Sequence, residues 1–138
     1  MTPATARISI AVRILMGALL PVMASCGQSA DDRPTSWSYI STTIVQPNCA
    51  TANCHATITQ RSGVDLSKIK EGYEVLLNGH FVNVDDPGGS PLLLLLRGVG
   101  NRRMPPDFAL PNADIELIER WIAARAPYDG PGLPAVSP

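Results

Sequence analysis

Two cysteines and a histidine in the middle of the chain constrain its fold more than any other feature. Cys49 and Cys54 are separated by four residues, and His55 follows the second cysteine directly. The four intervening residues are small or turn-prone, so the chain can loop out between the two thiols. In a chain of 138 residues, a group of this kind predicts that a disulfide, a metal or a covalent cofactor staples a small domain.

Three kinds of chemistry suit these residues. In an oxidising compartment, Cys49 and Cys54 can form a disulfide, since their offset permits closure. Zinc is a second possibility, although only His55 and His80 are available as histidine ligands. A covalent haem requires two thiols and a histidine directly after the second one, usually spaced as Cys-x-x-Cys-His. Haem best accounts for the adjacent histidine, although the spacing here is longer by two residues.

Residues 1–25 are predicted to be an export signal. Arg7 and Arg13 give this segment positive charge, and the apolar run that follows is too short for a comfortable membrane span. Residues 22–26, Val-Met-Ala-Ser-Cys, are similar to the lipobox of bacterial lipoproteins. That similarity implies that Cys26 is acylated and becomes the first residue of the mature chain. The alternative is an ordinary cleaved signal with Cys26 free or paired.

Either alternative predicts a protein that works outside the cytoplasm, and acylation predicts a lipid anchor. Gly27 follows the acylated position, where an aspartate would have favoured the inner membrane, so we expect the outer membrane in a two-membrane cell. Removing Arg7 and Arg13 from the eleven basic residues leaves nine against twelve acidic ones, a net charge of −3. The remaining sequence has no basic run, which argues against nucleic acid as a partner.

The rest of the chain is predicted to hold one domain between two irregular segments. Residues 26–35 are expected to be a polar tether, and residues 127–138 a tail that is rich in proline and glycine and disordered. The domain then covers residues 36–126. It contains no segment with the two-residue alternation of a strand, and several with helical spacing. We therefore expect an all-α fold with about four short helices.

Two of these helices are expected before residue 80. The first covers about residues 36–45 and should end before Pro47, because proline disfavours a helical residue in front of it. The second covers about residues 67–77, where apolar residues recur at steps of three and four. Gly79 is expected to end it.

Two more helices are expected after residue 90. Ser90 can cap the third and Pro91 suits its first position, and the leucines that follow extend it to Gly98. Asn112 is expected to cap the fourth helix, in which Trp121 should pack near the first helix. The inward-facing residues of this last helix are predicted to be Ile115, Ile118, Trp121 and Ile122.

A series of short motifs follows the cysteines in a specific order. They lie at residues 86–93, 96–98, 103–106 and 115–122. Together with the Cys-x4-Cys-His motif, they resemble the small exported monohaem cytochrome c domains of bacteria, and the resemblance spans about residues 40–126. It implies a cytochrome c-like fold, in which the helices wrap around one covalently attached haem c.

The resemblance also implies which residues hold the haem. Cys49 and Cys54 would attach it, and His55 would ligate its iron. In that family, the methionine of a Met-Pro loop is the second axial ligand, and Met104 is the corresponding residue. A thioether is a soft ligand that suits haem iron, and the two prolines after Met104 stiffen its loop. His80 is the alternative sixth ligand, and an open or water-bound position is the other alternative.

Supporting residues can be assigned to the haem as hypotheses. A guanidinium group suits a haem propionate, and the candidates are Arg97, Arg102 and Arg103. Aromatic side chains can line the haem, and the candidates are Tyr73, Phe81 and Phe108.

An iron ligated by both His55 and Met104 has no position for a substrate. The predicted function is therefore electron transfer rather than catalysis, with redox proteins as transient partners and the membrane bound through the N-terminal lipid. One alternative is a haem enzyme or sensor with an open sixth position. Another is a non-haem lipoprotein with a Cys49–Cys54 disulfide that acts as a binding or structural module. The sequence carries no signal of an oligomeric state.

Overall fold

The computed structural model describes residues 31–132, so the predicted leader and Cys26 lie outside the described residues. This part of the chain contains helices and no strand, which confirms the predicted all-α class. None of its helices is both long enough and apolar enough to cross a membrane. The α-helices are α1 (Trp37–Ile40), α2 (Gln46–Cys49), α3 (Ile69–Asn78), α4 (Pro91–Arg97) and α5 (Asn112–Ala123). Single 3-10 turns lie at Arg61–Gly63, Pro87–Gly89 and Val99–Asn101.

The first helix is longer than predicted, because it continues through Pro47 as far as Cys49. A π-helical turn, Ser41–Val45, joins α1 to α2. The wider π turn gives room for the proline ring, which in a regular α-helix would meet the carbonyl group four residues earlier. The Asn48 side-chain amide donates a hydrogen bond to the Ile44 carbonyl at 2.7 Å. As a result, the first cysteine of the motif is the last residue of a helix.

The core is centred on two tryptophans from opposite ends of the domain. Trp37 in α1 and Trp121 in α5 are both buried, and their ring centroids are 5.0 Å apart. This contact confirms the predicted position of Trp121 against the first helix. The two indole N–H groups donate to backbone carbonyls, that of Trp37 to Ile69 at 2.7 Å and that of Trp121 to Pro127 at 3.0 Å.

The later helices agree with the prediction in position but not in capping. The four residues predicted to face inward in α5 are all buried, and Gly98 ends α4 with a φ of +71°. However, Asn112 is the first helical residue, and no side chain among residues 31–132 caps α5. Ser90 does not cap α4 either. Its hydroxyl group accepts a hydrogen bond from the Asn83 N–H at 2.9 Å and so holds the preceding loop.

Both flanking segments contact the domain more closely than predicted. Asp31 and Arg33, in the predicted tether, form ion pairs with α5. At the other end, the Tyr128 ring packs 4.9 Å from that of Tyr73, and the Asp129 carboxylate accepts a hydrogen bond from the Ser38 N–H at 2.8 Å. The start of the predicted disordered tail is therefore irregular but packed, and residues 133–138 lie outside the described part.

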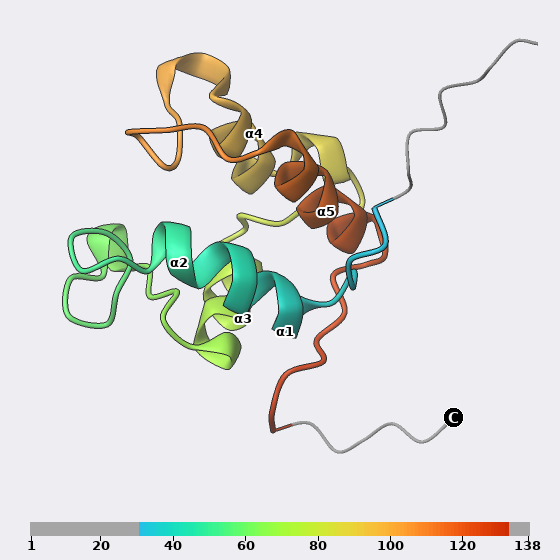
Figure 1. Ribbon diagram of the computed structural model, residues 1–138, viewed down its shortest axis with the longest axis horizontal. Helices are drawn as coiled ribbons and strands as arrows, with labels where there is room; N and C mark the ends of the chain where they lie inside the picture. Colours follow the sequence, from blue (N-terminus) through green and yellow to red (C-terminus); the bar gives the residue numbers. More distant parts are fainter. Residues whose placement is uncertain (1–30, 133–138) are drawn as a thin grey trace, which may run out of the picture.

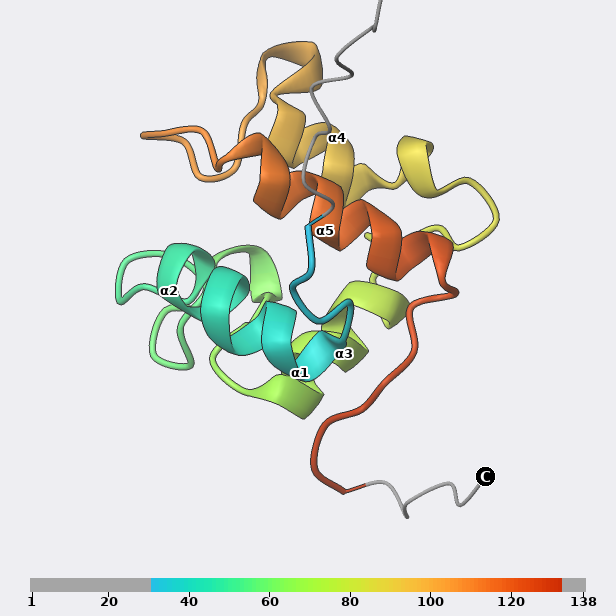
Figure 2. The same ribbon diagram turned by 45° about the vertical axis from the view of Figure 1, so that its right-hand side comes forward.

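The helices are arranged as two groups. Contacts join α1 to α3, α4 to α5, and α1 to α5. Figures 1 and 2 show the α1, α2 and α3 group below the α4 and α5 group. Two long connections project from the same end of the molecule, on the left of both views: the green segment 50–66 and the orange segment 98–110. The segments that carry the cysteine motif and Met104 therefore project at one end of the domain.

Candidate functional site

The cysteine motif forms a loop that is closed at its base. Cys49 ends α2, and the His55 N–H donates a hydrogen bond to the Cys49 carbonyl at 3.0 Å. The Cys54 N–H donates to the Thr51 carbonyl at 2.9 Å. Residues 51–53 are exposed at the tip. The two extra residues of the motif are thus accommodated in an outward loop, while Cys49 and His55 remain tied together.

The chain that follows holds this loop in place. The Cys54 carbonyl accepts a hydrogen bond from the Arg61 N–H at 3.0 Å, and the His55 carbonyl accepts one from the Leu66 N–H at 2.8 Å. The Leu66 side chain is buried, so this second bond joins the motif directly to the core. The backbone of His55 is therefore held by hydrogen bonds to one residue before it and one residue after it in the chain.

The two thiols are free, and Cys49 faces the apolar core. Its side chain helps to line a cavity of about 20 Å³. This volume suits about one water molecule. Burial, with the neighbouring Cys54 thiol as a smaller cause, raises the pKa of the Cys49 thiol to about 11. The other residues around the cavity are apolar: Trp37, Ile40, Ile44, Val45, Leu66, Leu76, Leu92, Leu96, Leu110 and Ile118.

The raised pKa predicts slow alkylation of Cys49 in the reduced, cofactor-free chain. Because the thiolate is the nucleophile, a shift from 9.0 to about 11 lowers its population at pH 8 about 100-fold relative to the unfolded chain. The rate should rise about tenfold per pH unit up to pH 11. Iodoacetamide labelling followed by peptide mapping measures it, with the chain in denaturant as control. Equal rates in the folded and denatured chain would contradict the burial of this thiol.

One ring nitrogen of His55 has no hydrogen-bond partner among the described residues. This atom, Nδ1, is buried. A buried polar atom in this state costs about 1–3 kcal/mol, so native proteins rarely leave one without a role. An imidazole is also a common ligand of metals and of haem iron. His55 is therefore the residue of this loop whose surroundings point most directly to a bound group.

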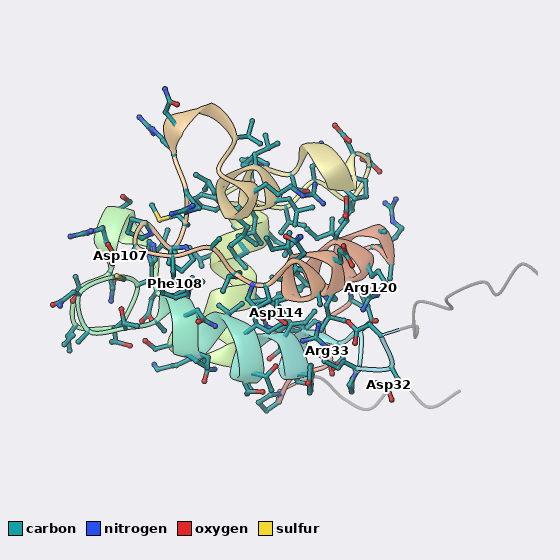
Figure 3. The ribbon with its side chains drawn as sticks, turned by 45° about the horizontal axis from the view of Figure 1, so that its top comes forward. Asp32, Arg33, Asp107, Phe108, Asp114 and Arg120 are labelled. Atoms are coloured by element: carbon teal, nitrogen blue, oxygen red, sulfur yellow. The ribbon has the colours of Figure 1, made fainter. Side chains whose placement is uncertain are left out.

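Met104 lies on the second connection, with its backbone held and its side chain accessible. The Met104 N–H donates to the Leu95 carbonyl at 3.0 Å, which ties the loop to the end of α4. The Met104 side chain is 37% exposed, and Phe108 on the same loop is 47% exposed. Figure 3 shows Phe108 at the end of the molecule that carries the cysteine loop. This end therefore presents a thioether and an aromatic ring that the core does not cover.

The remaining candidates lie in different surroundings. His80 is exposed just after α3, in a left-handed conformation with a φ of +57°. Arg97 forms an ion pair with Glu119 at 2.6 Å, whereas Arg102 and Arg103 form no ion pair with any residue between 31 and 132. These three arginines and Met104 line an open hollow at the surface.

Tyr73, one of the aromatic candidates, packs among other aromatic rings of the domain. Its ring packs against Trp37, Trp121 and Tyr128. Its hydroxyl group donates to the Ala126 carbonyl at 3.0 Å. Tyr73 is therefore part of the aromatic core between α1 and α5.

Sequence analysis assigned most of these apolar residues to helices but did not predict that they surround Cys49. Leu92 and Leu96 come from the leucine run and recur at four-residue spacing, which is a signal for one helical face. Leu66 and Leu110 come from separate loops. Leu66 precedes the apolar series of α3 at helical spacing, whereas Leu110 stands alone and carries no periodicity, so only the fold shows that Leu110 meets the others at this cavity.

Comparisons with protein-family models, curated proteins and solved structures give no match for this chain. Within residues 31–132, no three histidine, cysteine, aspartate or glutamate side chains come together as a metal-binding group. The candidate site is therefore interpreted from its own residues, which are two thiols, an imidazole and a thioether.

Proposed function

We propose that this chain is a lipid-anchored monohaem c-type cytochrome that transfers electrons. The observation that carries the proposal is the closed loop at one end of the domain. It brings together the free thiols of Cys49 and Cys54 and the unpartnered nitrogen of His55. The loop that exposes the Met104 thioether lies at the same end. Two thiols, an imidazole and a thioether are the groups that hold haem c with His/Met ligation.

The residues fit haem by their chemistry, while the enclosed cavity is too small to receive it. A volume of about 20 Å³ suits about one water molecule, far less than a porphyrin ring. The macrocycle therefore needs space outside this cavity. The cysteine loop and the Met104 loop leave Ile58, Met104 and Phe108 exposed. Covering these side chains would bury apolar surface that now faces water, which favours binding at this end.

Each residue has a distinct part in the proposed site. Cys49 and Cys54 would hold the haem through thioether bonds, and His55 and Met104 would ligate its iron. When bound, the haem supplies a one-electron redox centre. The hydrogen bond between His55 and Leu66 would keep the imidazole in place. The apolar side chains beside Cys49 would exclude water from one side of the group, which is one of the ways a protein adjusts a redox potential.

The proposed role is that of a carrier rather than an enzyme. Two protein ligands on the iron leave no position for a substrate, so electrons would pass to and from partner proteins in transient complexes. Acylation of Cys26 would keep the domain at a membrane surface outside the cytoplasm, with the outer membrane favoured. A net charge of −3 without the leader would steer such partners only weakly.

An absorption spectrum of the exported full chain tests the proposal against its alternatives. We expect the narrow visible bands of a low-spin c-type haem, and a mass increase of one haem on the peptide that contains Cys49 and Cys54. A haem-free chain with a Cys49–Cys54 disulfide would instead support a binding or structural lipoprotein. A high-spin spectrum that changes on addition of a small ligand would support an enzyme or sensor with an open position.

Met104→Ala is expected to remove the sixth ligand. The weak red band that accompanies methionine ligation of oxidised haem should disappear completely, and the reduction potential should fall, because a thioether ligand raises it. Absorption spectroscopy and a redox titration measure the two effects. His80→Ala is the matched control and should leave both unchanged. If the band persists in Met104→Ala, or disappears in His80→Ala, the assignment of Met104 is wrong.

A further inference from the structure

A compact group of charged residues joins the N-terminal segment to α5. The Arg33 guanidinium contacts both carboxylate oxygens of Asp31, with Nε–Oδ1 and Nη2–Oδ2 distances of 2.9 Å. It also donates from Nη1 to Asp114 at 2.5 Å, and Arg120 donates to Asp31 at 2.7 Å. Figure 3 shows Arg33, Asp114 and Arg120 turned toward one another. We refer to Asp31, Arg33, Asp114 and Arg120 as the tether cluster.

The tether cluster differs from an isolated surface ion pair. Its four groups alternate in charge and share partners, and the Asp31, Arg33 and Asp114 side chains are only 21%, 28% and 18% exposed. A two-pronged arginine–carboxylate contact is among the stronger ion pairs, and a network adds to it. Hydrogen bonds from Arg33 and then from Arg120 hold the pKa of Asp31 well below its usual range. The Asp31 carboxylate therefore remains charged throughout the neutral pH range.

The cluster shortens the tether between the predicted lipid and the domain. Asp31 lies five positions after Cys26, and this stretch of chain can span at most about 18 Å when extended. Without the cluster, the free segment would run to Ser36, the residue before α1. It could then span about 35 Å. A domain of a hundred residues has a radius of gyration of about 13 Å, which corresponds to a sphere about 34 Å in diameter. The longer tether can therefore reach around the domain and let it turn over, whereas the shorter one cannot.

The cluster is also distant from the candidate site. In Figure 3, Asp32 and Arg33 lie at one end of the molecule, and Asp107 and Phe108 lie at the other. Figure 1 shows the same separation between the start of the blue segment and the two projecting loops. A lipid attached close to Asp31 therefore places the opposite end of the domain farthest from the membrane.

We propose that the tether cluster fixes the orientation of the domain on the membrane, with the cysteine and Met104 loops directed away from the lipid surface. This inference rests on the proposed lipid anchor at Cys26. The surface around α5 and Asp31 then faces the membrane. The opposite end of the domain, which carries the cysteine and Met104 loops, is left free for partner proteins. An unrestrained tether would let these two loops approach the membrane for part of the time.

Energy transfer to the membrane tests this orientation. The full-length, exported lipoprotein is labelled with a far-red dye at Asp107→Cys, a position on the exposed loop. It is then reconstituted into phosphatidylethanolamine and phosphatidylglycerol vesicles that contain an acceptor on the headgroups. We expect low transfer with the cluster intact. Arg33→Gln should raise the efficiency at least about twofold, because the tether reach grows from about 18 to about 35 Å. Asp31→Asn is a second variant that should have the same effect.

Arg125→Gln is the matched control. It breaks the ion pair between Arg125 and Asp85, whose side chains are 71% and 81% exposed, and should leave the transfer unchanged. Equal transfer in the Arg33→Gln, Asp31→Asn and reference proteins, all bound to vesicles and equally helical, overturns the orienting role alone. A protein that does not remain with the vesicles shows that Cys26 carries no lipid and overturns both the anchor and the orientation. Labelling of more than one cysteine per chain shows instead that the proposed haem is not attached.

Discussion

Replacing both Cys49 and Cys54 by alanine is expected to abolish covalent haem attachment completely. Each thiol would form one bond to the haem, and within residues 31–132 the chain has no other cysteine. The variant should also lose order in the two projecting loops, because the core leaves Met104 and Phe108 exposed there and a bound haem would cover them. The helices around Trp37 and Trp121 should persist in part, since the contact between the two indole rings does not involve the cysteines.

Mass spectrometry and circular dichroism measure the two consequences of this double variant. Mass spectrometry should show no haem on the purified chain, and thermal unfolding should become broader and occur at a lower temperature than for the haem-containing protein. Thr51→Ala is the matched control, because Thr51 is an exposed residue of the same loop and should leave attachment unchanged. Haem bound covalently to the double variant, or unfolding identical to that of the haem-containing protein, would show that these thiols are not the attachment points.

The helices could be predicted from the sequence because their signals are local. Leu93, Leu96 and the apolar face of α5 recur at helical spacing, and all are buried as this spacing predicts. The end of the first helix could not be predicted in the same way. Pro47 is a strong stop signal, yet the π turn at Ser41–Val45 lets the helix continue to Cys49. Whether such a turn forms depends on how the whole helix packs against the rest of the domain. A local sequence pattern carries no information about that packing.

The capping errors have a similar cause. Ser90 has the right residue type and position for a cap, but Asn83 is close enough in space to use its hydroxyl group. Serine side chains readily form hydrogen bonds with nearby backbone groups. The fold determines which backbone group lies within reach of the hydroxyl.

The candidate site was predictable in its residues but not in its arrangement. The spacing of Cys49, Cys54 and His55 is visible in the sequence, and so is the exceptional position of Met104 between an arginine and a proline. The His55 N–H closes the loop by bonding to the carbonyl of Cys49, the last residue of α2. The sequence predicts that this helix ends earlier, before Pro47, so it does not predict the closure. The tether cluster joins residues 81 and 89 positions apart. No periodicity or motif relates charges at such separations, so only the fold reveals them.

Trp121→Ala is expected to destabilise the domain by about 3–5 kcal/mol, the cost of removing a large aromatic side chain from a packed core. Trp121 is completely buried, and its ring lies 5.0 Å from Trp37 and 6.3 Å from Tyr73. Small domains are stable by only about 5–15 kcal/mol, so the variant should be close to unfolding. Urea denaturation followed by circular dichroism measures the change in the free energy of unfolding.

Trp121→Phe separates the packing of this residue from its hydrogen bond. Phenylalanine keeps much of the ring contact but cannot donate to the Pro127 carbonyl, which the Trp121 indole N–H does at 3.0 Å. The loss of one such bond costs about 1 kcal/mol. It should also release the segment that carries Tyr128 and Asp129, which proteolysis of the C-terminal segment would detect. If Trp121→Ala costs no more than Trp121→Phe, the contact between the first and last helices does not stabilise the fold, and the core must be centred elsewhere.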